Sequence, residues 1–280
     1  ATVAGNLSVD GGTIKLDGNY PVGTNNVALG DAAFGSGNLT GGGNTAIGRE
    51  ASFSNTSGQH NVALGQAANY AITTGTSNVG VGSQALRFTT TADNNTAVGY
   101  QSLYTNVTGA DNTAFGAYSL YSNTTGTRNV GVGKHALLAA TTGNDNVAVG
   151  FVAADSLTTA SNTTAIGSWA LAGNTTGSNN TGIGYRALYL NTTASNNTAV
   201  GYTAGYSNTT GAQNTFIGRQ ASYRNTTGLY NSSFGNDALY YNTTGGYNTA
   251  LGAAALNNNT TASANTAVGY QALTTNTTGG

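Results

Sequence analysis

The most regular candidates for chemistry are asparagines that begin an Asn-x-Thr or Asn-x-Ser triplet, the acceptor for N-linked glycans in secreted proteins. The triplets recur 17 residues apart, or at multiples of 17, along the chain. An alternative is that Asn and Thr are good corner residues whose side chains hydrogen-bond to the local backbone. The candidate acceptors are Asn38, Asn55, Asn106, Asn123, Asn174, Asn191, Asn208, Asn225, Asn242, Asn259 and Asn276.

Other residue types that support catalysis or ligand binding do not form a pattern. His60 and His135 occupy different places in the repeat described below and lack recurrent acidic or nucleophilic neighbours, so no triad or metal cluster is predicted. Residues 41–43 are glycines without the Lys-Thr or Lys-Ser and the helix of a phosphate loop. Asp93 and Asp111 do not recur in every repeat, as a calcium-binding repeat requires. The sequence therefore predicts no enzyme, metal or cofactor.

The composition excludes further classes of partner. Eight Lys and Arg residues against nine Asp and Glu residues give a formal charge of -1 over 280 residues, so no basic face attracts nucleic acid. Cysteine is absent, which excludes disulfides and thiolate metal sites. No apolar run reaches the roughly 20 residues that cross a bilayer. We expect neither a nucleic-acid partner nor membrane insertion in this segment.

These triplets belong to a longer repeat. Each copy of the repeat contains a segment similar to Asn-Thr-Ala-Val-Gly, and the glycine at the end of that segment defines the alignment. Counted from that glycine as position zero, the consensus has Asn at -4, an aliphatic residue at -1, Ala at +3, Leu at +4, Tyr at +5 and Asn-Thr-Thr-Gly from +7. The first such glycine is Gly30, and the next lies 18 residues later. From there the spacing is 17 throughout, giving the corner glycines Gly48, Gly65, Gly82, Gly99, Gly116, Gly133, Gly150, Gly167, Gly184, Gly201, Gly218, Gly235, Gly252 and Gly269.

The variation among repeats predicts the environment of each position. Position -1 is always apolar and mostly β-branched, which predicts an inward-facing strand residue. Position +3 accepts only Ala or Ser, which predicts tight packing, and the invariant glycine predicts a positive φ or a corner without room for Cβ. Positions +1 and +2 accept Lys134, Trp169 and Arg186, so we expect them to face solvent.

A 17-residue unit cannot bury a core alone, so the repeats must stack. We predict an all-β protein, a parallel β-solenoid with 17-residue coils, in which fifteen coils spaced ~4.8 Å apart span roughly 70 Å. The Asn column at -4 and the Tyr column at +5 would form in-register ladders. Residues 1–25 would form a lead-in or cap that contains Pro21, and the solenoid would occupy residues 26–280 and continue beyond them.

Two segments carry a family resemblance that covers residues 26–280. Residues 95–103 (Asn-Thr-Ala-Val-Gly-Tyr-Gln-Ser-Leu) and 265–273 (Asn-Thr-Ala-Val-Gly-Tyr-Gln-Ala-Leu) resemble the head repeats of trimeric autotransporter adhesins and similar repeats in bacteriophage tail fibres. The resemblance implies a left-handed β-roll with three chains side by side, although this repeat is longer than that of the adhesins. The alternative is a single-chain triangular left-handed β-helix with positions -1, +4 and +10 inward.

These patterns predict a structural fibre or shaft protein of a phage-type tail fibre or surface adhesin that acts in attachment, outside the cell or on a virion. An apolar Leu-Tyr stripe at +4 and +5 would be covered in a homotrimer, and end-to-end fibrils are a further form of self-association. The outside partner would be a host-surface receptor or glycan. Two alternatives are a glycan-coated fibril scaffold and an ice-binding solenoid that uses the Thr columns at +8 and +9, of which one residue per coil would face outward.

Overall fold

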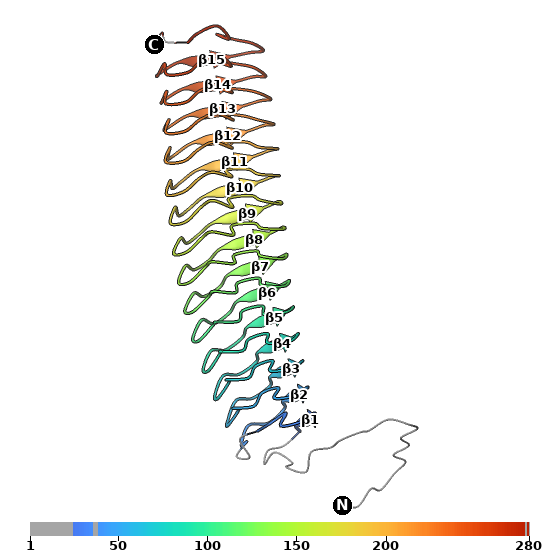
Figure 1. The fold of residues 1–280 in the computed structure, drawn as a ribbon. Coiled ribbons are helices and arrows are strands. Elements are labelled where there is room, and N and C mark those ends of the chain that lie inside the picture. Colours follow the sequence, from blue (N-terminus) through green and yellow to red (C-terminus); the bar gives the residue numbers. More distant parts are fainter. Residues whose placement is uncertain (1–24, 36–38, 278, 280) are drawn as a thin grey trace, which may run out of the picture.

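The computed structural model describes residues 25–35, 39–277 and 279, and they form a rod of stacked coils (Figure 1). Fifteen three-residue strands make one parallel sheet in chain order, and the described residues contain no helix. The predicted all-β parallel solenoid is confirmed, while the expected lead-in lies almost wholly outside the described residues. The strands are β1 (Val27–Leu29), β2 (Thr45–Ile47), β3 (Val62–Leu64), β4 (Val79–Val81), β5 (Thr96–Val98), β6 (Thr113–Phe115), β7 (Val130–Val132), β8 (Val147–Val149), β9 (Thr164–Ile166), β10 (Thr181–Ile183), β11 (Thr198–Val200), β12 (Thr215–Ile217), β13 (Ser232–Phe234), β14 (Thr249–Leu251) and β15 (Thr266–Val268).

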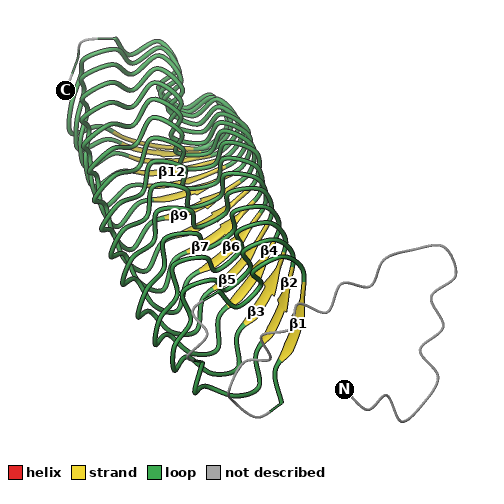
Figure 2. Ribbon diagram, turned by 60° about the horizontal axis from the view of Figure 1, so that its bottom comes forward, coloured by secondary structure: helices red, strands yellow, loops and turns green. Residues whose placement is uncertain are grey.

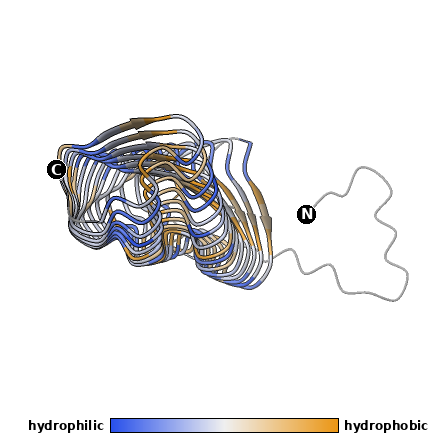
Figure 3. Ribbon diagram, turned by 90° about the horizontal axis from the view of Figure 1, so that it is seen from above, coloured by the Kyte–Doolittle hydropathy of each residue, from blue (hydrophilic) through white to orange (hydrophobic). Residues whose placement is uncertain are grey.

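Every strand pairs in register with the equivalent strand of the next coil. Thr113 of β6, for example, lies opposite Val130 of β7. The strands occupy one side of the rod, and loops form the rest of each coil (Figure 2). Seen along the axis, successive coils lie over one another (Figure 3), so each repeat position forms a column along the rod.

The loops are hydrogen-bonded between coils as well, through residues with left-handed backbone conformation. Tyr118 at +2 has φ +59° and donates its N–H to the carbonyl of Tyr100 in the preceding coil, 3.0 Å away. Leu120 at +4 has φ +52° and donates to Ala136 in the following coil, also at 3.0 Å. Each such conformation costs about 1–2 kcal/mol for a non-glycine residue. The cost is offset because the N–H groups point alternately up and down the rod and find partners in both neighbouring coils.

The corner glycines combine a positive φ with close approach to the next coil. Their φ angles run from +122° to +140°. A Cβ on Gly150 would lie 2.7 Å from the carbonyl carbon and oxygen of Gly167, much closer than real Cβ contacts. Both reasons proposed for the invariant glycine therefore apply at once.

The strand residue that faces the interior is the middle one, at -2, and the prediction that -1 faces inward is wrong. In β6, Ala114 is fully buried, whereas Phe115 at -1 is 55% exposed. Leu120 at +4 is fully buried within its own coil, as are most leucines of that column. The triangular arrangement with -1 inward is therefore wrong, and the leucines form no outward stripe for a trimer to cover. Position +1 is exposed in most coils, as expected, but +2 is partly buried, as at Trp169.

Interior volume is shared between the +4 residue of one coil and the -2 residue of the next. Most coils combine Leu with Ala or Gly. The coil with Gly205 at +4 is followed by Phe216 at -2, and the Phe216 ring occupies the space that a side chain at 205 would need. A third solution pairs two serines, with the Ser222 hydroxyl 3.0 Å from that of Ser233. At Gly205 and Phe216, the absence of a side chain in one coil is therefore matched by a large side chain in the next.

This sharing predicts strong coupling between Gly205 and Phe216. Phe216→Ala should cost about 3–5 kcal/mol because it opens a cavity, and Gly205→Leu should cost about 1–3 kcal/mol by overpacking. The double variant recreates the consensus Leu-Ala pair, so its free energy of unfolding in urea should return close to that of the unmodified chain. The control combines Phe216→Ala with Lys134→Ala in a distant coil, where the effects should add. Additivity in both pairs would contradict the shared-volume interpretation.

Candidate functional site

The triplet asparagines at +7 lie inside the coils and form a ladder. The amide nitrogen of Asn123 donates to Asn106 Oδ1 at 2.8 Å and to the carbonyl of Gly126 at 3.0 Å, which uses both of its hydrogens. Asn38 lies outside the described residues, and Asn276 in the last coil is half-buried. The remaining candidate acceptors are fully buried: Asn55, Asn106, Asn123, Asn174, Asn191, Asn208, Asn225, Asn242 and Asn259.

This geometry favours the corner interpretation of the Asn-Thr-Thr motif over the glycan acceptor. A sugar on Nδ2 would replace buried hydrogen bonds and would have to occupy the interior of the rod. A sequence signal for burial was present, because Ile72, Ala140 and Leu157 stand in the same column, and all three are fully buried. A column that alternates between Asn and aliphatic residues is typical of an interior position.

A second asparagine ladder runs along the -4 column, immediately before the strands. Asn95 Oδ1 accepts the backbone N–H of Asn112 at 3.0 Å, and Asn112 Nδ2 donates to the carbonyl of Gly126 at 2.8 Å. At Thr163, the one break in the column, the backbone N–H still donates to Asn146 Oδ1 at 3.0 Å. The two ladders meet at a shared acceptor, because Asn112 Nδ2 and Asn123 Nδ2 both donate to the carbonyl of Gly126.

The +7 ladder predicts different effects for two changes that both remove one glycan acceptor. Asn208→Ala leaves Asn191 Oδ1 and one hydrogen of Asn225 Nδ2 without partners, so it should cost about 2–3 kcal/mol. Thr210→Ala removes the same acceptor at an exposed position and should be nearly neutral. Urea unfolding of both variants measures the difference. Equal stabilities, together with sugar mass on the native chain, would contradict the ladder as the role of this column.

The threonines at +8 and +9 have separate roles. The Thr124 hydroxyl at +8 donates to the carbonyl of Thr141 in the next coil at 3.1 Å, and this bond recurs along the rod. Thr125 at +9 is exposed. Only one of the two columns presents free hydroxyl groups to solvent.

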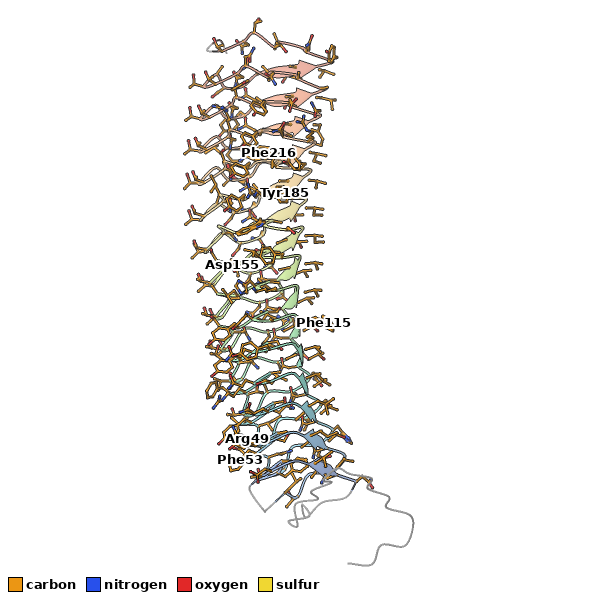
Figure 4. All side chains as sticks on the ribbon, turned by 45° about the vertical axis from the view of Figure 1, so that its right-hand side comes forward. Arg49, Phe53, Phe115, Asp155, Tyr185 and Phe216 are labelled. Carbon is orange, nitrogen blue, oxygen red and sulfur yellow. The ribbon has the colours of Figure 1, made fainter. Side chains whose placement is uncertain are left out.

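The outer strand face is the outward surface of the sheet, formed by the side chains at -3 and -1. Phe115 projects from it, away from the coils (Figure 4). The face contains no charged residue: position -3 is Thr, Val or Ser. Position -1 is a continuous apolar column: Leu29, Ile47, Leu64, Val81, Val98, Phe115, Val132, Val149, Ile166, Ile183, Val200, Ile217, Phe234, Leu251 and Val268. This column, and not the leucines at +4, is the apolar stripe of the rod.

The +5 column carries a stack of aromatic rings on the loop side. Tyr189, Tyr206, Tyr223 and Tyr240 stack with centroids 5.3, 5.0 and 5.2 Å apart and rings within 17° of parallel. The faces of the two inner rings are therefore covered by their neighbours. The in-register tyrosine ladder expected from the sequence is present.

The aromatic column is interrupted over three coils, where Leu138, Asp155 and Ala172 stand in place of rings. Asp155 lies on the loop side of the rod (Figure 4). Its Oδ1 atom is buried without a hydrogen-bond partner, and His135 Nδ1 lies 3.9 Å away. Burial raises the pKa of the Asp155 carboxyl, and the neighbouring His135 opposes that shift. A cavity of about 160 Å³ opens beside Asp155, lined also by Trp169, Ala172 and Tyr189.

The raised pKa predicts a pH-dependent stability difference for Asp155→Asn. The pKa of this carboxyl is higher in the folded chain than in the unfolded chain. Its contribution to the free energy of unfolding therefore falls as the pH rises from the unfolded pKa through the folded pKa. The asparagine variant should therefore have the higher melting temperature at pH 7, and the gain should vanish below about pH 3, where both forms are neutral. Exposed Asp31→Asn controls for the change in net charge. A gain that persists at low pH would contradict this origin.

The remaining candidate residues stay apart. Within residues 25–35 and 39–277, no three His, Cys, Asp or Glu side chains gather closely enough to hold a metal ion. The same part of the chain has no helix of sufficient length and apolar character to span a membrane. No protein-family model, curated protein or solved structure matches the chain.

Proposed function

We propose that the chain is the shaft of a fibre that projects from a virion or cell surface and acts in attachment, as in phage-type tail fibres and surface adhesins. The observation that carries the proposal is the uninterrupted stack, in which fifteen strands pair in chain order. Such a stack extends in one direction and has the same hydrogen-bonded cross-section along its length, which suits a stiff spacer. The adhesin-like and tail-fibre-like repeats support the same role.

The outer strand face is the surface through which copies of the chain would associate. Fifteen strands at ~4.8 Å spacing and three residues of ~3.3 Å give a face of roughly 70 by 10 Å, or about 700 Å². A standard interface buries about 800 Å² on each partner. The face is uncharged and repeats at one spacing in every copy, so the faces of neighbouring copies can meet in register about a common axis. A homotrimer is the arrangement that the adhesin-like repeats imply.

Polar changes on this face should weaken association without unfolding the rod. Phe115→Gln with Ile166→Gln alters two exposed side chains, 55% and 39% accessible, on the outer strand face. The control, Val107→Gln with Leu229→Gln, alters two similarly exposed apolar residues outside the sheet. Light scattering after size exclusion should give a multiple of 27.9 kDa for the unmodified chain and the control, and at least tenfold weaker association for the first variant. A monomeric unmodified chain at about 100 µM would contradict the proposal.

A second candidate function, ice binding, is favoured by one feature of the same face. Position -3 is threonine in most coils, with a hydroxyl and a methyl, and -1 is aliphatic in most coils. The two columns run in parallel along a sheet with ~4.8 Å spacing. Such columns can hold a matching layer of ordered water. A monomeric chain that depresses the freezing point below the melting point of ice would favour this function, while a stable multimer with that face covered would exclude it.

A further inference from the structure

The break in the aromatic column leaves a slot one ring wide. The slot is the space between Asp155 and Tyr189, with Ala172 and Gly173 as its floor. Asp155 and Tyr189 belong to coils two apart, so their backbones are separated by roughly 9.6 Å along the axis. In the coils that follow, that distance is filled by a tyrosine ring at +5. Ala172 leaves the middle position open, in a cavity of about 160 Å³.

One wall of the slot is the aromatic ring of Tyr189. This ring stacks on Tyr206, and the Arg186 guanidinium carbon lies 5.3 Å from its centroid. Towards the slot, Ala172 stands in the column position where the next ring would be. Trp169 forms a second wall, with its ring 6.1 Å from that of Tyr189 and tilted by 65°. Phe151 packs edge-on against Trp169, with ring centroids 5.7 Å apart, and supports it from the preceding coil. The slot therefore offers an apolar surface for the flat side of a ring.

The opposite wall is a hydrogen-bond acceptor. Asp155 keeps 28% of its side-chain surface accessible, although its Oδ1 atom is buried towards His135. The other carboxylate oxygen, Oδ2, remains for a ligand. A carboxylate facing an aromatic ring across one ring's thickness selects a ligand with an apolar flat side and hydroxyl donors at its edge.

We propose that the slot binds one pyranose residue of a surface glycan, with its C–H face on Tyr189, its edge against Trp169 and its hydroxyls donating to Asp155. A flat hydrocarbon ring would give the carboxylate no donor. A cationic ligand would meet His135 beside the same carboxylate and would gain little from Ala172 and Leu190, which also line the slot. This inference rests on the attachment role proposed above, to which it adds the chemical class of the partner.

The chain contains its own reporter for this site, because Trp169 is its only tryptophan. Titration of the full chain with the methyl pyranosides of glucose, galactose and mannose should change the Trp169 fluorescence in a saturable way for at least one sugar. A single ring of that size should bind with a Kd on the order of 1 mM. Tetramethylammonium chloride serves as the cationic probe in the same assay.

Two variants and a matched control locate the binding. Ala172→Tyr fills the slot with the residue that other coils carry at +5 and should abolish the sugar response in a folded rod. Asp155→Asn should weaken binding about tenfold. Asn257→Tyr adds a ring to the far end of the same stack and should leave the response unchanged.

Three results would overturn the sugar site: silence to every pyranoside, a full response in Ala172→Tyr, or a stronger response to the ammonium probe than to sugars. Light scattering reports association separately. If the chain forms multimers but no pyranoside changes the Trp169 fluorescence, the sugar site is contradicted and the shaft role is not. A monomer that binds sugar would lose the proposed association.

Discussion

The hydrogen bond from one coil's backbone to the next is the interaction on which the whole rod depends. It recurs in the strands, at the glycine corner and through the loops, as in Gly116 to Val98 and Thr124 to Thr141. Because both neighbours must be reached, the chain accepts left-handed conformations at residues such as Leu120 and Tyr118. The same demand favours a constant repeat length, because each donor must meet its acceptor in the next coil. The 18-residue interval between Gly30 and Gly48 keeps this register as well, since β1 still pairs residue for residue with β2.

The period and the small-residue positions could be read from the sequence because they follow from backbone geometry alone. A fixed period requires stacking, and an invariant glycine requires an unusual φ or a close approach; Gly150 has both. Which side chains of each strand face the interior could not be predicted in this way. A three-residue strand with the sequence Thr-Ala-Phe can bury either Ala114 or its two neighbours. The larger apolar residue was expected inside, but Leu120 and the asparagine ladder already occupy that narrow interior.

The Asn-Thr-Thr motif shows why a short motif alone does not identify a site. An asparagine that bonds to the carbonyl three residues later makes a good corner, and the same triplet is a glycan acceptor. What separates the two interpretations is the rest of the column. Leu157 and Ile72 replace the asparagine without disturbing the coil, which suits an interior position and gives no support to a modification site. Comparison between coils was informative here because each column samples one environment many times.

The same comparison locates the places where a regular rod can carry recognition. A column that repeats without change presents the same groups along its whole length, so a ligand has no single binding position on it. Specific binding needs a position where the column changes while the backbone ladder continues. The tyrosine column satisfies that condition at Ala172, whose neighbours keep their hydrogen bonds: Gly173 N–H still donates to Tyr189 at 2.9 Å. The backbone thus supplies rigidity that does not depend on the side chain at +5, and one side chain missing from a stack becomes a preformed slot. In a protein of this kind, the repeated residues form the shaft, and a binding site is expected where a residue departs from the repeat.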